Sequence, residues 1–322
     1  MYSGYITDVP GIKVGHEQSV EGMTGCTVVL CEEGVVAGVD VRGSAPGTRE
    51  TDLLSPEKLV DKVHGIVLSG GSAFGLDACS GVMKCLEERN IGFDVGVTRV
   101  PIVCGAVIFD LNIGNYRIRP DYQMGYNACL NASITENRQG NIGCGMGATV
   151  GKILGPKNAM KSGLGSASIK IGDVWVGAIV SVNSFGDVYD YKTNQLLAGV
   201  IDNNSNTLLN TYELMKSDGK MAAFPMRNTT IGVVATNAIL TKAHANKVAQ
   251  MAQNGLVRSI NPIHTMLDGD TVFAISTCEV EADINLVGTL ASEVISMAIT
   301  NAVKYAEGCD GILAWKDIKR NI

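Results

Sequence analysis

The sequence contains few charged and few aromatic residues, and several targeting signals are missing from it. Charged residues make up 18% and aromatic residues 5% of the 322 positions, and the formal net charge is −6. A chain with this acidic balance lacks the basic surface of general nucleic-acid or anionic-membrane binders. No run of 18 apolar residues suggests a transmembrane helix. The N-terminal segment Met1–Pro10 has no basic and no apolar region, so we expect no signal peptide and a cytoplasmic protein.

The patterns of common metal and hydrolase sites are also absent. The nine cysteines are odd in number and form no C-x-x-C pair, which indicates reduced thiols rather than a disulfide framework. The four histidines are not spaced as a metal-binding pair, and no H-E-x-x-H motif occurs. There is no G-x-S-x-G motif for a histidine-assisted serine nucleophile. We therefore expect neither a metal nor an organic cofactor.

Glycine, by contrast, is abundant, with 38 residues in a chain that is 46% apolar. This composition predicts a large packed core with many tight backbone approaches. The block Gly143–Ala148 fits the pattern G-x-G-x-x-A, but the polar stretch Asn137–Asn141 stands where a dinucleotide-binding fold needs a strand. A nucleotide site is therefore not indicated.

Apolar periodicity predicts alternating strands and helices without a simple βαβ rhythm, and hence an α/β or α+β fold. The predicted strands cover 27–31, 35–41, 65–68, 229–236 and 270–277, with two more in 166–182 around the turn at 172–173. The predicted helices cover 75–90, 241–256, where Thr241 is the expected N-cap, and 290–305. Residues 194–227 are polar and rich in loop formers, with one short helix expected at 208–215.

The step from Asn228 to Thr229 joins this polar stretch to a strongly apolar strand. An ordinary strand start explains the two residues, since asparagine favours turns and threonine favours strands. Self-cleavage is the alternative: the Thr229 hydroxyl attacks the Asn228 carbonyl, and hydrolysis of the ester leaves Thr229 as a new N-terminus. Its free α-amine, with an ordinary pKa of about 7.7–8.0, then serves as base for the hydroxyl without a histidine.

The segment Asp268–Asp270 places two carboxylates on either side of a glycine. In an extended segment, residues two apart face the same side, so both carboxylates can serve one site. An Asp-Gly step is equally a turn signal. The sequence pattern alone leaves both interpretations open.

Several motifs together resemble the self-processing D-aminopeptidase/D-esterase and β-peptidyl aminopeptidase family of N-terminal-nucleophile-type hydrolases, across nearly the whole chain. The matching segments are Thr7–His16, Thr24–Val28, Val41–Gly43, Gly47–Glu50, Leu68–Leu76, Gly145–Lys152, Asn228–Ile231, Val234–Asn237 and His264–Thr271. Asn-Thr-Thr at 228–230 and Asp-Gly-Asp at 268–270 are similar to the nylon-oligomer hydrolase branch.

The resemblance implies an α+β fold, a four-layer αββα sandwich with the connectivity of ornithine acetyltransferase. It implies a single domain over 1–322 that cuts itself between Asn228 and Thr229. The fragments 1–228 and 229–322 are expected to stay associated, in a homo-oligomer that is commonly a tetramer.

The resemblance also assigns site residues. It makes Thr229 the nucleophile and Asn183 the oxyanion-binding amide, with Lys152 adding charge stabilisation. It maps the two carboxylates that hold Thr229 in attacking geometry onto Asp268 and Asp270. A family tyrosine proposed to bind the oxyanion is replaced here by Phe109, so one hydroxyl donor is missing.

The expected function is therefore that of an N-terminal-threonine amidohydrolase or aminopeptidase. Its expected substrates are small peptides or amides of D-, β- or ω-amino acids, and no nucleic acid or membrane partner is expected. The first alternative is an acyltransferase of the ornithine-acetyltransferase type, in which an amine replaces water as acceptor. The second is a non-catalytic member whose precursor is never cut.

Overall fold

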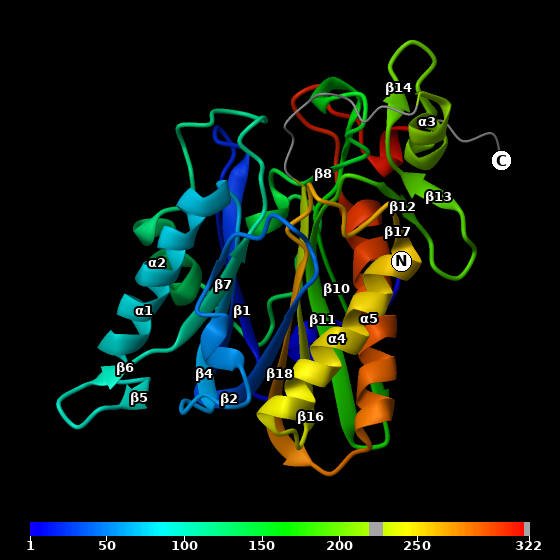
Figure 1. Cartoon of the computed structure of the whole chain (residues 1–322). Helices are drawn as coiled ribbons and strands as arrows, with labels where there is room; N and C mark the ends of the chain where they lie inside the picture. The colour runs from blue at the N-terminus through cyan, green and yellow to red at the C-terminus, as the bar shows by residue number, and fades with distance from the viewer. Residues whose placement is uncertain (219–227, 319–322) are drawn as a thin grey trace.

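The computed structural model describes residues 1–218 and 228–318, and its centre is a mixed nine-stranded sheet (Figure 1). The sheet runs in the order β10 (Leu164–Ile171), β11 (Val174–Asn183), β16 (Thr229–Ala238), β18 (Thr271–Val280), β2 (Thr24–Val41), β4 (Lys62–Ser69), β7 (Val103–Val107) and β3 (Thr48–Arg49), with β1 (Lys13–Ser19) added to β2. The pairs β16–β18 and β4–β7 are parallel, and the other pairs are antiparallel.

The long strand β2 joins the two ends of this sheet. Its first part pairs with β1 and β4, with Leu30 opposite Gly65, and its last part pairs with β18, with Val36 opposite Ser276. The register shifts between Leu30 and Val35. At this place the sequence predicted a break between two separate strands, 27–31 and 35–41. The two predicted strands are thus one interrupted strand.

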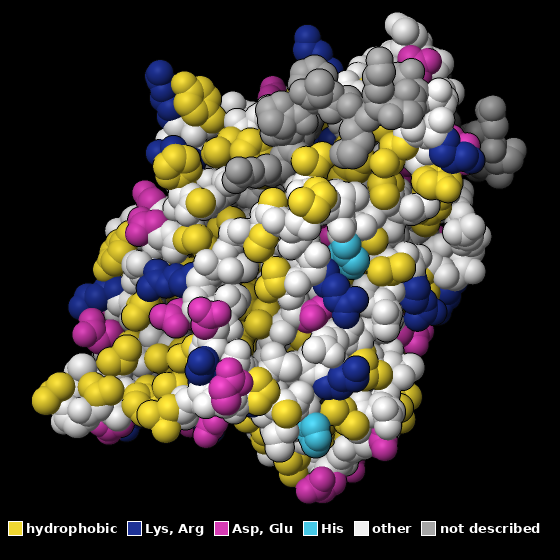
Figure 2. All heavy atoms as spheres, in the orientation of Figure 1, with side chains coloured by type: hydrophobic (Ala, Val, Ile, Leu, Met, Phe, Trp, Pro, Cys, Tyr) yellow, Lys and Arg dark blue, Asp and Glu magenta, His cyan; other side chains and the backbone are white. Residues whose placement is uncertain are grey.

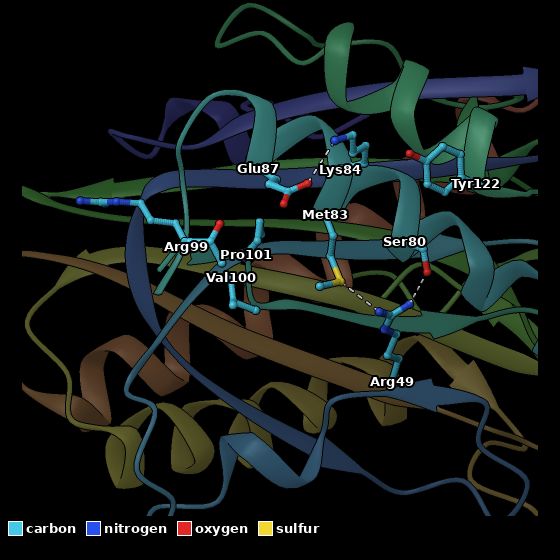
Figure 3. Close-up of a pocket in the computed structure, with 10 residues that line it drawn as sticks. Arg49, Ser80, Met83, Lys84, Glu87, Arg99, Val100, Pro101 and Tyr122 are labelled. Carbon is cyan, nitrogen blue, oxygen red and sulfur yellow. Dashed lines mark hydrogen bonds and ion pairs between the residues drawn. The ribbon is translucent and has the colours of Figure 1, made fainter. Parts of the chain in front are cut away.

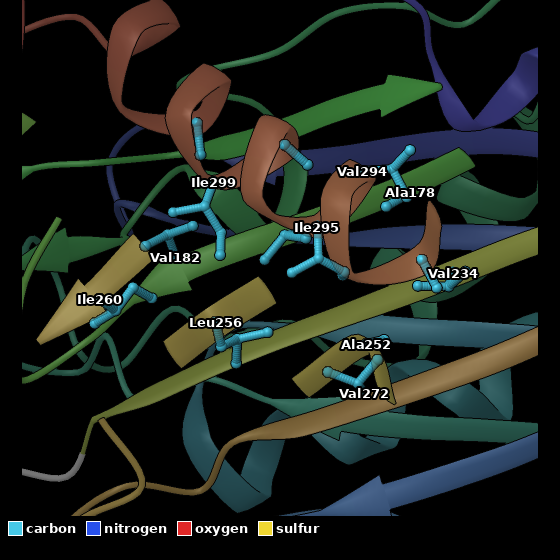
Figure 4. Packing of buried hydrophobic residues seen from close by; sticks show 14 of the residues in the cluster. Ala178, Val182, Val234, Ala252, Leu256, Ile260, Val272, Val294, Ile295 and Ile299 are labelled. Atoms are coloured by element: carbon cyan, nitrogen blue, oxygen red, sulfur yellow. The ribbon is translucent and has the colours of Figure 1, made fainter. Parts of the chain in front are cut away.

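Two helix pairs cover the two ends of the sheet (Figure 1). The helices α4 (Lys242–Ser259) and α5 (Ile284–Tyr305) pack on β10, β11, β16 and β18. The helices α1 (Ala78–Glu88) and α2 (Tyr122–Leu130) pack on β1, β2, β4 and β7. Figure 4 shows the first of these interfaces, where Leu256 of α4 and Ile295 of α5 meet Val182 and Val234 of the sheet.

The strand residues that face away from the helices form one further core. Ile179, Val233 and Phe273 come from one end of the sheet, and Ile66 and Cys104 come from the other end, yet all belong to a single buried cluster. The two ends of one continuous sheet therefore share a core between them. The fold prediction is confirmed in its coarser form, a mixed α/β fold with a central sheet and helices, and the four-layer sandwich of separate sheets is not confirmed.

Small elements gather at the end of the sheet where β16 begins (Figure 1). They are β8 (Thr149–Val150), β9 (Met160–Lys161), β12 (Asp187–Tyr189), β13 (Leu196–Ala198), β14 (Ile201–Asp202), β15 (Thr207–Leu208), β17 (Ile260–Asn261) and α3 (Thr211–Asp218). The expected helix at 208–215 is thus shifted to α3. The expected polar linker ends in residues 219–227, which lie outside the described residues.

Other elements compare well with the sequence prediction. The hairpin β10–β11 and the strands β16 and β18 are confirmed, and the Thr241 hydroxyl caps α4 by accepting the backbone N–H of His244 at 3.2 Å. The helix α5 begins earlier than predicted, at Ile284. The sequence analysis missed β1, β7, α2 and the short hairpin of β5 (Phe93–Asp94) and β6 (Arg99–Val100).

The helix α5 is long and apolar enough to cross a membrane by length and composition alone, which the search for unbroken apolar runs did not reveal. In the structure, 83% of its most apolar window is buried. It packs against α4, β10 and β11, as the central helix of a globular core does. All nine cysteines are free, seven are buried, and Cys278 and Cys309 are partly buried.

Candidate active site

The junction predicted for self-cleavage lies at the start of β16, next to the loop that precedes β18. The backbone N–H of Asn228 donates to the Leu267 carbonyl at 2.9 Å, and Asn228 pairs with Asp268 in a parallel bridge. Thr229 is buried, and its Oγ1 donates to the Asn228 carbonyl oxygen at 2.5 Å. The hydroxyl therefore lies beside the carbonyl group that it would have to attack.

The same carbonyl oxygen has a second hydrogen-bond donor. The backbone N–H of Gly269 donates to the Asn228 carbonyl oxygen at 2.9 Å. A Cβ atom at Gly269 would lie 2.9 Å from Thr229 Oγ1 and 2.7 Å from the Ala45 carbonyl oxygen. Glycine thus allows the 268–270 backbone to approach the hydroxyl closely. The sequence analysis treated Gly269 only as part of a turn or a spacer, because a backbone donor leaves no signal in the sequence.

Asn183 ends β11, directly opposite Thr229 in the β11–β16 pair. Its side chain is fully buried, and its Oδ1 accepts from Lys152 Nζ at 2.7 Å and from the Thr149 N–H at 3.1 Å. Its Nδ2 donates to the Phe109 carbonyl oxygen at 2.9 Å. An amide nitrogen carries two hydrogens, so one remains for another acceptor. Lys152 thereby fixes which end of the Asn183 amide can donate.

The two predicted carboxylates are held in different ways. Asp268 Oδ2 accepts from the backbone N–H and the hydroxyl of Thr265 at 2.7 and 2.6 Å, whereas its buried Oδ1 has no hydrogen-bond partner among the described residues. Asp270 Oδ1 accepts from the Thr230 N–H at 2.7 Å, and its Oδ2 lies 2.9 Å from His264 Nδ1. The Asp270 carboxylate therefore contacts the 228–230 segment directly, whereas Asp268 is joined to it through the backbone bridge with Asn228.

The backbone of the Asp-Gly-Asp segment is anchored to the segment that follows β2. The Ala45 N–H donates to the Asp268 carbonyl at 2.8 Å, and the Arg42 N–H donates to the Asp270 carbonyl at 3.0 Å. A Cβ atom at Gly43 would lie 2.3 Å from the backbone of both aspartates, so only glycine fits there.

Burial shifts the ionisation of the charged groups. It lowers the pKa of Lys152 to about 7, although Asp268 and Asp110 favour the charged form. Burial also raises the pKa of Asp268 to about 6, with a further rise from Asp270 and an opposing effect of Lys152. Burial raises the pKa of Asp110 to about 6, while hydrogen bonds from Thr24 and Gly71 lower it. The site thus combines a lysine and carboxyls that titrate within a narrow pH range.

The structure therefore brings all the predicted site residues, Asn228, Thr229, Asn183, Lys152, Asp268 and Asp270, into one connected cluster. Sequence reasoning missed Gly269, and it assigned no role to His264 or Asp110, although all three lie in or next to quoted motifs. Among residues 1–218 and 228–318, no group of three His, Cys, Asp or Glu side chains is arranged to hold a metal ion.

A separate cavity of about 440 Å³ lies between α1 and β6 (Figure 3). Arg49 extends into this region and donates to Ser80 Oγ at 2.9 Å and to Met83 Sδ at 3.0 Å. None of the residues of the Thr229 cluster lines this cavity.

Solved structures identify the class of the fold. An L-aminopeptidase D-Ala-esterase/amidase from Ochrobactrum anthropi, described as a prototype of the serine aminopeptidases and a new variant of the Ntn hydrolase fold, has a TM-score of 0.72 and 17% identity; 98% of this chain and 91% of that chain are covered. A β-aminopeptidase from Burkholderia sp. has a TM-score of 0.66 and 19% identity, over 94% and 86% of the two chains. The chain thus has a mixed α/β fold similar to the folds of these two aminopeptidases.

Sequence comparison identifies the family. The family model for Peptidase family S58 matches residues 4–314. An uncharacterized aminopeptidase of Mycobacterium leprae is 40% identical over 339 aligned positions, which cover 95% of this chain and 92% of that protein. A 6-aminohexanoate-oligomer endohydrolase of Kocuria sp. is 30% identical, with coverage of 92% and 85%. The chain belongs to Peptidase family S58 and is a hydrolase of peptide or amide bonds.

Proposed function

We propose that this protein is a self-processing amidohydrolase in which Thr229 first cuts the chain and then acts as an N-terminal nucleophile. The observation that supports this most directly is the contact of the Thr229 hydroxyl with the Asn228 carbonyl oxygen, on which Gly269 also donates a hydrogen bond. A backbone N–H on the oxygen of the bond to be cut is the arrangement that stabilises an oxyanion.

The first stage is an N-to-O acyl shift. Thr229 Oγ1 attacks the carbonyl carbon of Asn228, and we assign the uptake of its proton to the carboxylate of Asp268, the residue that pairs with Asn228 in the parallel bridge. Negative charge on the carbonyl oxygen is stabilised by the Gly269 N–H, and we propose that charged Lys152, bonded to Asn183 opposite Thr229, adds to this stabilisation. The C–N bond then breaks as the Thr229 nitrogen takes this proton from Asp268, which returns to its carboxylate form. Water hydrolyses the resulting ester, which leaves a carboxylate on Asn228 and a free amine and hydroxyl on Thr229.

The second stage uses the new N-terminus on an external amide. The α-amine of Thr229 takes the hydroxyl proton, the hydroxyl attacks the substrate carbonyl, and an acyl-enzyme forms as the amine product leaves. The remaining N–H of the Asn183 amide is a suitable oxyanion donor, and Lys152 keeps it oriented. Water then releases the acid product. Because Phe109 supplies a carbonyl and no hydroxyl here, we propose that Asn183 carries most of this stabilisation.

The substrates that we propose are amides of amino acids, including ω-amino acids. The similarity to 6-aminohexanoate-oligomer endohydrolases and to aminopeptidases supports this substrate class. The four-layer arrangement with ornithine-acetyltransferase-like connectivity, the cytoplasmic location and the homo-oligomer stay predictions. The shared core between the two helix-covered ends of the sheet supports the first of them.

Intact mass spectrometry of the purified protein tests the proposal. We expect two species, 1–228 and 229–322, for the wild type and for Thr229→Ser, which keeps a hydroxyl. Thr229→Ala removes the nucleophile and should give a single uncut chain. A wild-type chain that stays whole, or a Thr229→Ala chain that is cut at the same bond, would refute self-cleavage by Thr229.

A further inference from the structure

His264 contacts the site carboxylate Asp270 through two of its own atoms. Its Nδ1 lies 2.9 Å from Asp270 Oδ2, and its backbone N–H donates to the same oxygen at 3.2 Å. An ionised carboxylate only accepts hydrogen bonds, so the ring nitrogen is the donor in this contact. Asp270 is fully buried, and its other oxygen accepts from the Thr230 N–H. Of the three hydrogen bonds that the described part of the chain makes to the Asp270 carboxylate, His264 thus supplies two.

The backbone of His264 has an unusual conformation for this purpose. Its φ is +57°, in the left-handed region that few residues other than glycine adopt, although histidine is enriched there. In this conformation the ring and the backbone N–H of one residue reach the same carboxylate oxygen. Such conformations persist where the surrounding structure fixes them and are concentrated at functional sites.

The surroundings of the second ring nitrogen indicate that the ring of His264 serves to contact Asp270. Nε2 is buried and has no hydrogen-bond partner among residues 1–218 and 228–318, and 17% of the side chain is exposed. Leaving a buried nitrogen without a partner lowers stability, so an apolar side chain would fill this space at less cost. The polar ring is favourable only through its Nδ1 contact.

We propose that His264 is a positioning residue for Asp270, and through it for Thr229. By holding Oδ2, His264 keeps Oδ1 on the Thr230 N–H, and this bond fixes the backbone immediately after the nucleophile. This role rests on the proposed function and adds a residue to it. It extends the site by one layer: His264 orients the carboxylate, the carboxylate orients β16, and β16 presents the Thr229 hydroxyl to the Asn228 carbonyl.

Substitutions at His264 test the role, with self-cleavage followed by intact mass spectrometry on freshly synthesised chain. His264→Ala removes the ring donor, and we expect roughly ten- to hundredfold slower cleavage, as for loss of a charge-assisted hydrogen bond. His264→Asn places an amide N–H close to the position of Nδ1 and should restore most of the rate. The matched control is His244→Ala, because His244 is an exposed histidine on α4. Circular dichroism melting checks that each variant folds.

A double-mutant cycle separates positioning from general packing. Asp270→Asn should itself slow cleavage, and adding His264→Ala should then cost little more, because the partner is already altered. On an amino-acid p-nitroanilide, the processed His264→Ala protein should lose kcat with little change in KM. Three results would overturn the role while leaving self-cleavage intact. They are wild-type cleavage speed in His264→Ala, equal losses in His264→Ala and His264→Asn, and additive losses when His264→Ala is combined with Asp270→Asn. A wild-type chain that is never cut would overturn both.

Discussion

Lys152 lies at the charge centre of the site, bonded to Asn183 and within the electrostatic influence of Asp268 and Asp110. Lys152 is fully buried and forms no direct ion pair with a described residue, so its charge is costly to keep, and this cost lowers its pKa. The neutral amine can still donate a hydrogen bond to Asn183 Oδ1. Only the cation, however, adds positive charge beside a developing oxyanion.

The rate of self-cleavage should therefore depend on pH in a bell shape. Below about pH 6, Asp268 becomes protonated and cannot accept the Thr229 proton, and above about pH 7, Lys152 loses its charge. We expect the fastest cleavage of freshly synthesised chain between these values, measured by mass spectrometry from pH 5 to 9. Lys152→Met should remove the alkaline limb and lower the maximum by roughly tenfold or more.

Amide hydrolysis by the processed protein provides the contrast. It requires an unprotonated α-amine on Thr229, whose ordinary pKa is about 7.7–8.0, so its rate should still rise where self-cleavage falls. A self-cleavage rate that is constant from pH 5 to 9 would remove both Lys152 and Asp268 from that step.

At the scale of elements, α4 packs against α5 and against the strands β2 and β18. Leu256 is fully buried against α5 and the sheet (Figure 4), whereas its neighbour Val257 is 54% exposed. Adjacent residues of a helix point about 100° apart around its axis. Leu256 and Val257 therefore share the same helix turn but differ in how their side chains pack.

Leu256→Ala should destabilise the folded protein by about 2–5 kcal/mol through lost burial and a residual cavity. The matched control Val257→Ala should change stability by no more than about 0.5 kcal/mol. Urea unfolding followed by circular dichroism measures both, on the uncut Thr229→Ala background so that a single chain unfolds. Similar losses in the two variants would contradict the assigned faces of α4.

At the scale of the whole molecule, the strand order intermixes the two expected fragments. The strands β16 and β18, which follow the proposed cut, lie between β11 and β2, which precede it. The strand pairs β11–β16 and β18–β2 are therefore both hydrogen-bonded contacts between the two expected fragments.

On the face shown in Figure 2, acidic and basic side chains are mixed among apolar ones.

The cut chains should consequently remain together as one particle. We expect fragments 1–228 and 229–322 to elute together in size-exclusion chromatography without denaturant, and to separate only in concentrations that unfold the sheet. A tag on residue 1 should retain the 229–322 fragment on an affinity column. Loss of the untagged fragment under native washing would contradict the interleaved strand order.

The sequence by itself determined several local elements and predicted the candidate site residues. Short-range patterns predicted β16, β18, the β10–β11 hairpin and the Thr241 cap, because alternation and capping depend on neighbouring residues. The family motifs predicted Thr229, Asn183, Lys152 and the two aspartates. They could do so because the type and position of each of these side chains can be read directly from a sequence motif.

Only the tertiary structure decided how those pieces meet. It placed Asn183 opposite Thr229, and joined β2 into one strand that links both ends of a continuous sheet. It also showed the Gly269 N–H on the Asn228 carbonyl and the His264 ring on Asp270. The physical reason is that strand pairing between distant segments depends on the topology of the entire chain. Backbone donors are present at nearly every residue, so their partners depend on where the fold places them.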